Sequence, residues 1–174
     1  MGNVYFEHMI RRKMGVQGVF LRVLIIIGAV ILLLIPFAIG ILQLLPVVAV
    51  AAIFGAKNLF SRFDYEFEYI ITNSEMDVDR IMGKKSRKRL LTVDCRSFEI
   101  LAPYRIEHIV KYEQENIVRR IDASSSPDSP DRYFALFPDK SGGKPGGMVM
   151  LVFEPNERMM DAFHTYAAKK IMKR

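Results

Sequence analysis

The run of residues 23–56, VLIIIGAVILLLIPFAIGILQLLPVVAVAAIFGA, contains no Asp, Glu, Lys, Arg or His. A straight α-helix of this length would span about 50 Å, whereas the hydrocarbon core of a bilayer is about 30 Å thick. Pro36, Gly40 and Pro46 interrupt the middle of the run, and proline breaks a helix because it lacks a backbone donor. We therefore predict a helical hairpin over 17–61 that crosses a membrane twice, with Pro46 in the first turn of the second helix.

Positive charges flank this run at both ends. The net charge of the 174-residue chain is +6, and the excess lies beside the apolar run. Cytoplasmic flanks of membrane helices are enriched in Lys and Arg, so two crossings keep both basic flanks inside, whereas one crossing would export one of them. We predict a multi-pass plasma-membrane protein with both termini in the cytoplasm. The flanking residues are Arg11, Arg12, Lys13, Arg22, Lys57 and Arg62.

The same distribution argues against binding to nucleic acid. From Asp64 onward, acidic and basic residues nearly cancel. A nucleic-acid-binding protein would more often carry its positive excess on the folded domain. The partner that the charges indicate is the lipid bilayer.

Beyond the apolar run, the hydrophobic period changes from helical to two. Tyr65, Phe67, Tyr69 and Ile71 alternate with more polar residues, which is typical of a strand with one wet face. Similar patterns separated by turn residues predict further strands. The seven predicted strands cover about 65–72, 76–79, 91–95, 97–101, 117–123, 132–137 and 148–154. Residues 103–116 give no clear signal.

The chain closes with a predicted amphipathic helix. Asn156 is a favourable N-cap, and Glu157 complements the N-terminal dipole. Met160, Phe163, Ala167 and Ile171 recur at helical spacing. This order of elements resembles the pleckstrin-homology (PH) superfold, an α+β domain in which seven antiparallel strands form a partly open barrel capped by a C-terminal helix.

Short stretches of sequence extend the resemblance over nearly the whole chain. FDYEFEYIITNSEMDVDRI, GKKSRKRLL and LAPY are similar to an uncharacterised family of small bacterial membrane proteins. The resemblance implies two membrane helices followed by a PH-like domain, and it implies no reaction. We therefore expect a cytoplasmic basic N-terminus at 1–16, the transmembrane hairpin at 17–61 and a cytoplasmic PH-like domain at 64–174, which should fold alone as a soluble monomer.

The densest group of charges follows the second predicted strand. One hypothesis is that it contacts anionic lipid headgroups, each base contributing about 1 kcal/mol near such a surface. The other is that it is a solvated hairpin that adds to the positive flank. The sequence leaves both open. The residues are Lys84, Lys85, Arg87, Lys88 and Arg89.

Catalytic, metal and cofactor sites are not predicted. His8, His108 and His164 are scattered, and the sequence has no zinc-binding or phosphate-binding motif. Cys95 is predicted to be a buried structural thiol. We therefore expect a membrane-tethered binding or adaptor module rather than an enzyme, with anionic headgroups or a protein or peptide as its ligand. The alternative is a structural or accessory subunit of a larger membrane complex.

Overall fold

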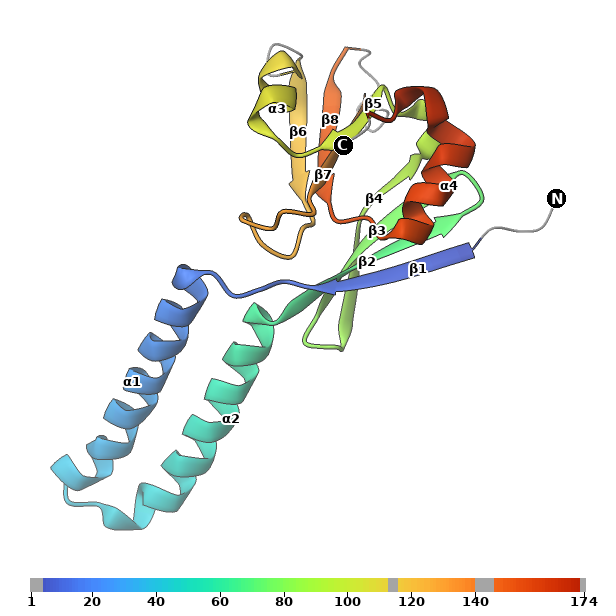
Figure 1. Ribbon diagram of the computed structural model, residues 1–174. Coiled ribbons are helices and arrows are strands. Elements are labelled where there is room, and N and C mark those ends of the chain that lie inside the picture. Colours follow the sequence, from blue (N-terminus) through green and yellow to red (C-terminus); the bar gives the residue numbers. More distant parts are fainter. Residues whose placement is uncertain (1–4, 113–115, 140–145, 173–174) are drawn as a thin grey trace. The chain divides into compact units, whose positions relative to one another are not determined.

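The computed structural model describes residues 5–112, 116–139 and 146–172 (Figure 1). The chain divides into two compact units. One consists of Lys13–Tyr65 together with Met82–Ser86, and the other contains the remaining described residues. We refer to them as the helical unit and the sheet unit.

The helical unit is a pair of apolar helices. Helix α1 covers Val16–Ala38 and α2 covers Leu45–Phe63, and the two lie side by side (Figure 1). Gly40, with φ of +72°, and a 3-10 turn at Leu42–Leu44 reverse the chain between them. Pro46 lies in the first turn of α2, where the sequence predicts it, because the missing N–H would have no partner there. Both helices are long and apolar enough to cross a membrane.

The first sheet of the sheet unit has the strand order β1-β2-β3-β4. Its strands are β1 (Tyr5–Arg11), β2 (Tyr65–Thr72), β3 (Glu75–Met82) and β4 (Ser86–Asp94). One face supplies core side chains, since Tyr69, Ile71, Met76 and Val78 are fully buried. The predicted inward positions of β2 are confirmed, but its other face is not wet as predicted, because Glu68 is buried there.

Strand β1 is not predicted from the sequence. It pairs with β2 in antiparallel register from Tyr5 opposite Thr72 to Arg11 opposite Glu66. A polar residue, His8, faces inward, while the apolar residues Tyr5 and Met9 are exposed. The strand therefore lacks the alternation of apolar and polar residues by which a strand is predicted. Because β1 and β2 are paired neighbours, both apolar helices are inserted into the connection between two adjacent strands.

The second sheet has the order β5-β7-β8-β6. Its strands are β5 (Ile100–Pro103), β6 (Ile117–Asp122), β7 (Tyr133–Pro138) and β8 (Met148–Phe153). Strand β6 runs parallel to β8, while β5 and β8 are antiparallel to β7.

The prediction of seven antiparallel strands is therefore wrong in two respects. The described residues form eight strands in two four-stranded sheets, and one pair is parallel. The physical reason for the parallel pair is the strand order. Strand β8 pairs with both β7 and β6, and because β7 separates β6 from β8 in the chain, the connection is long enough for a parallel crossover. Within the described chain, no strand pair joins the two sheets, and the partly open barrel stays a prediction.

A short helix covers the outer face of the second sheet. Helix α3 covers Ile106–Tyr112, inside the segment that gives no sequence signal. Its Ile109 joins a cluster with Phe134, Leu136 and Met150 from the sheet. The outer face of the second sheet is thereby covered.

Helix α4 (Glu157–Ala167) closes the main core. The Asn156 side chain accepts a 2.9 Å hydrogen bond from the N–H of Met159, so the predicted N-cap is confirmed. Phe163 is fully buried and packs on Phe98 and Phe153, with ring centroids 5.9 Å apart in each pair. Met159, rather than Met160, is the buried methionine of the first turn.

Candidate functional site

The predicted basic group begins in a tight turn between β3 and β4. Gly83 and Lys84 have φ of +56° and +57°, and the N–H of Lys85 donates to the carbonyl of Met82 at 3.1 Å. Two successive left-handed residues suit a two-residue hairpin because their twist matches that of the paired strands. The side chains of Lys84 and Lys85 are exposed at its tip.

This turn lies against the C-terminal end of α2, within the helical unit. The N–H of Gly83 donates to the carbonyl of Asp64 at 2.9 Å. A Cβ atom added to Gly83 would lie 3.2 Å from the carbonyl oxygen of Ser61, so a larger residue would be crowded there. Lys84 and Lys85 are consequently held beside the last turn of α2, which also carries Arg62.

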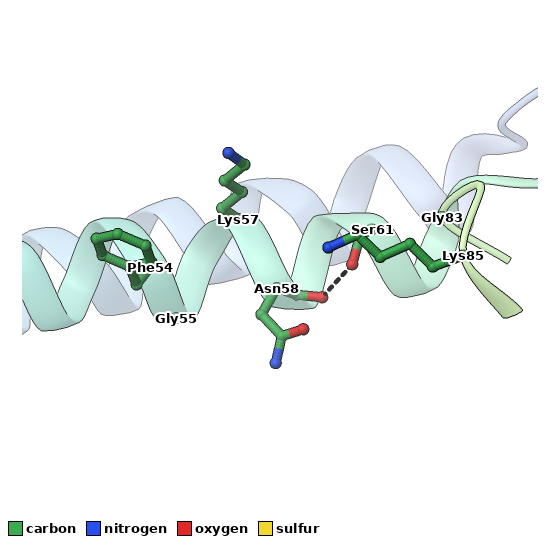
Figure 2. Close-up of a pocket in the computed structure, with 7 residues that line it drawn as sticks. All are labelled: Phe54, Gly55, Lys57, Asn58, Ser61, Gly83 and Lys85. Carbon is green, nitrogen blue, oxygen red and sulfur yellow. Dashed lines mark hydrogen bonds between the residues drawn. The ribbon is translucent and has the colours of Figure 1, made fainter.

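A groove of about 710 Å³ runs between the turn and α2 (Figure 2). The turn contributes Gly83 and Lys85. Figure 2 shows the Lys85 side chain directed back along α2, toward Ser61 and Asn58. The Ser61 hydroxyl donates a 2.8 Å hydrogen bond to the carbonyl of Asn58. The residues that line the groove are Phe54, Gly55, Lys57, Asn58, Ser61, Gly83 and Lys85.

The two arginines of the basic group have a different environment from its lysines. Arg87 forms ion pairs with Glu68 and Asp79. Arg89 contacts Asp79 and Asp77, each at 2.8 Å. Both arginines are thus paired with acidic residues of the neighbouring strands. Within the described parts of the chain, Lys84, Lys85 and Lys88 form no ion pair and keep their charges free.

The acids of this network are buried under the arginines. Glu68 and Asp79 are each 1% exposed. Burial raises the pKa of Glu68, a hydrogen bond with Glu7 acts in the same direction, and the charge of Arg87 opposes both. The network therefore ties β1, β2, β3 and β4 together across one face of the first sheet.

The residues predicted to flank the membrane fall into two groups. In the sheet unit, the Arg12 guanidinium donates a 2.8 Å hydrogen bond to the carbonyl of Ser124 and lies 3.3 Å from the Asp122 carboxylate. In the helical unit, Arg22 lies over the Phe60 ring at 5.5 Å. The remaining flanking positions are the end of β1 (Arg11), the link to α1 (Lys13) and the second half of α2 (Lys57 and Arg62).

Arg12 belongs to a polar cluster that the sequence does not reveal. Burial alone would raise the pKa of Asp122, but hydrogen bonds from Ser124 and the charge of Arg12 outweigh it and lower that pKa. The Tyr69 hydroxyl donates a 2.6 Å hydrogen bond to the carbonyl of Ala123. These contacts join the end of β1 and the middle of β2 to the loop after β6. Their partners lie over 50 residues apart in sequence, so local pattern carries no signal of them.

The described residues contain no group of three His, Cys, Asp or Glu side chains arranged to hold a metal ion. Cys95 is fully buried, as predicted, and burial raises its pKa to about 12. Its thiol is thus a weak nucleophile at neutral pH.

Two sheets closed by a C-terminal helix are the architecture expected of a PH-like domain. The chain belongs to the bacterial PH-like domain family DUF6106, whose model matches residues 2–173. The family resemblance seen in the sequence is confirmed, and the match includes β1 and both apolar helices. Comparison with curated proteins and with solved structures finds no match.

Proposed function

We propose that the protein is a PH-like binding or adaptor module tethered to the cytoplasmic face of the plasma membrane by α1 and α2. The observation that carries the proposal is the pairing of β1 with β2. Arg11, which ends β1, lies opposite Glu66, which is the second residue of β2. The chain therefore leaves the sheet for α1 and returns from α2 at neighbouring positions.

This pairing supports two crossings rather than one. A single crossing would put β1 and β2 on opposite sides of the membrane, where they could not pair. Two crossings put both on one side. At about 1.5 Å per residue, the 23 residues of α1 and the 19 of α2 span about 35 and 29 Å. Both lengths suit a hydrocarbon core of about 30 Å.

The surface of the helices supports a membrane environment. Large side chains such as Phe20, Ile31, Val47 and Phe54 are at least half exposed. A contiguous apolar surface of this kind is unfavourable in water. Basic residues lie toward the ends of both helices that are opposite the 3-10 turn. They favour a cytoplasmic location of the sheet unit.

The binding role rests on the family and on the sheet edges. In this proposal the two sheets and α4 act as the partly open barrel of a PH-like domain. Strand β4 is an edge of the first sheet, and exposed edges accept extended peptides by strand addition. A protein or peptide partner is therefore proposed alongside the lipid bilayer. No catalytic role is proposed.

Cysteine labelling in intact cells tests the topology. Gln43→Cys, in the 3-10 turn between the helices, should react with a membrane-impermeant thiol reagent. Lys169→Cys, exposed after α4, should react only after permeabilisation. The wild-type chain measures the background from buried Cys95. Labelling of Lys169→Cys in intact cells, or protection of Gln43→Cys, would contradict the proposal.

A second function is favoured by the same exposed helix surface. The outer faces of α1 and α2 can pack on other membrane helices instead of lipid, as in an accessory subunit. Purification in mild detergent separates the two functions. A stoichiometric membrane partner that survives purification supports the accessory subunit, whereas a chain that purifies without one supports the tethered module.

A further inference from the structure

The groove between α2 and the β3–β4 turn has the features of a lipid site. Both walls of the groove belong to the helical unit, so their positions relative to each other are defined. The hydrogen bond from Gly83 to Asp64 holds the turn at the end of α2. The wall formed by the turn carries Lys85, and the wall formed by the helix carries Lys57.

The charge of the groove is positive. Among the described residues that line it, two are lysines and none is acidic. The Asn58 side chain adds an amide, whose NH₂ group has two donors. The Ser61 hydroxyl is already donated to the helix backbone. The donors therefore suit an anionic group with several acceptor oxygens, and a phosphate ester has this chemistry.

The polarity of the groove changes along α2. Phe54 and Gly55 lie about 10 Å deeper along the helix than Ser61, at 1.5 Å per residue. If α2 crosses the membrane, the Ser61 end with Lys85 lies at headgroup level and the Phe54 end at the level of the acyl chains, and the long side chain of Lys57, about 6 Å deeper than Ser61, extends toward the headgroups. A free phosphate ion would use the first end and leave the second empty, whereas a phospholipid fills both.

We propose that this groove binds the phosphate of an anionic glycerophospholipid from the cytoplasmic leaflet, with Lys57, Asn58 and Lys85 at the headgroup and Phe54 against an acyl chain. The proposal rests on the membrane-tethered function and names a ligand for it. It also assigns different roles to the basic group. Lys85 contacts lipid, whereas Arg87 and Arg89 hold the sheet together.

Gly55 offers a direct way to block the groove. A Cβ added at Gly55 meets no atom within 4 Å, and the same holds for Gly28 on α1, which does not line the groove. Gly55→Leu therefore places a branched side chain in the groove from a Cβ position with open space around it, and Gly28→Leu is the matched control. Lys57→Gln and Lys85→Gln remove the charges while keeping side chains of similar length.

The test uses the full-length chain purified in mild detergent and native mass spectrometry with added phosphatidylglycerol or phosphatidylcholine. We expect one tightly bound phosphatidylglycerol, weaker binding of phosphatidylcholine, and retention of the anionic lipid in Gly28→Leu. Each lysine substitution should weaken binding about fivefold, which corresponds to the usual contribution of one base near an anionic lipid surface. Gly55→Leu should abolish the bound lipid. Circular dichroism of each variant shows that the fold is kept.

Equal binding of phosphatidylglycerol by Gly55→Leu and the wild type would overturn the proposal, as would equal affinity for the two lipids. Displacement of the lipid by excess inorganic phosphate would also overturn it, because the site would then recognise phosphate alone. These outcomes are independent of topology, since binding is measured in detergent. Failure of the tethered function itself appears separately, in the labelling of Gln43→Cys and Lys169→Cys.

Discussion

The backbone N–H of Gly83 donates a 2.9 Å hydrogen bond to the carbonyl of Asp64, the C-cap residue directly after α2. This bond places the β3–β4 turn beside the point where the helix leads into β2. The turn is therefore held against the end of α2 within the helical unit. The side chains of Lys84 and Lys85 extend from this turn.

Gly83→Ala should weaken the contact of the β3–β4 turn with the end of α2. Gly83 has φ of +56°, and a Cβ there would lie 3.2 Å from the Ser61 carbonyl oxygen. The left-handed conformation and the crowding together should cost about 2 kcal/mol of unfolding free energy. Thermal unfolding of the full chain in detergent measures the loss. Gly28→Ala is the control, since Gly28 lies inside α1 with open space around its Cβ position, and equal midpoints for the two variants would contradict this role of Gly83.

Asp79→Ala should destabilise the first sheet. Asp79 is 1% exposed and receives the Arg89 guanidinium at 2.8 Å. Its loss leaves Arg87 and Arg89 with fewer acids, although both are about half exposed and stay partly solvated. We expect a loss of about 2 kcal/mol, below the range for a fully buried pair. Chemical denaturation gives the value, and Asp161→Ala on the exposed side of α4 should change it little.

The docking of β1 should depend on pH through His8. This residue is half-buried beside Tyr69, and burial lowers its pKa, while Glu154 acts in the opposite direction. A lowered folded pKa means that the neutral form is favoured in the folded state. The contribution of His8 to the free energy of unfolding is fully present above its unfolded pKa of about 6.5. It is lost as the pH falls toward the folded pKa.

The measurement is the unfolding midpoint on either side of that unfolded value, at about pH 7.5 and about pH 5.5. We expect the midpoint to fall on acidification in the wild type and to fall less in His8→Phe. His164→Gln, on the exposed part of α4, should behave as the wild type. An identical pH dependence in His8→Phe and the wild type would show that His8 does not titrate with folding.

The features that the sequence predicts are those set by local pattern. The break between the helices follows from Pro36, Gly40 and Pro46, and the period of two in β2 follows from residues that all face one core. Asn156 caps α4 in the structure because its side chain satisfies a neighbouring N–H. In each case the cause lies within a few residues of the effect.

The features that the sequence does not predict depend on distant partners. Strand β1 is separated from β2 by the whole helical hairpin, and β6 is separated from β8 by residues 123–147, which include β7. The lysines and arginines of the basic group look equivalent in sequence. Only the neighbouring strands, which place Glu68 and Asp79 against Arg87, distinguish them.

The central claim is that the apolar hairpin is an insertion between two paired strands. A chain that keeps residues 5–12, replaces 13–64 with a short Gly/Ser turn and continues through 65–172 tests it most directly. Because Arg11 lies opposite Glu66, a loop of about four residues is long enough to join them. The comparison chain is the fragment 64–174, which lacks β1 and exposes the edge of β2.

We expect the joined chain to be a soluble monomer with a higher unfolding midpoint than the fragment, since β1 restores a strand and the Arg12 contacts with Ser124 and Asp122. The sequence predicts that the fragment 64–174 folds alone as a soluble monomer. Because β1 pairs with β2, we now expect the fragment to be less stable and to associate through its open edge. Size-exclusion chromatography with thermal unfolding decides the matter. A joined chain that aggregates, or that melts no higher than the fragment, would contradict the account.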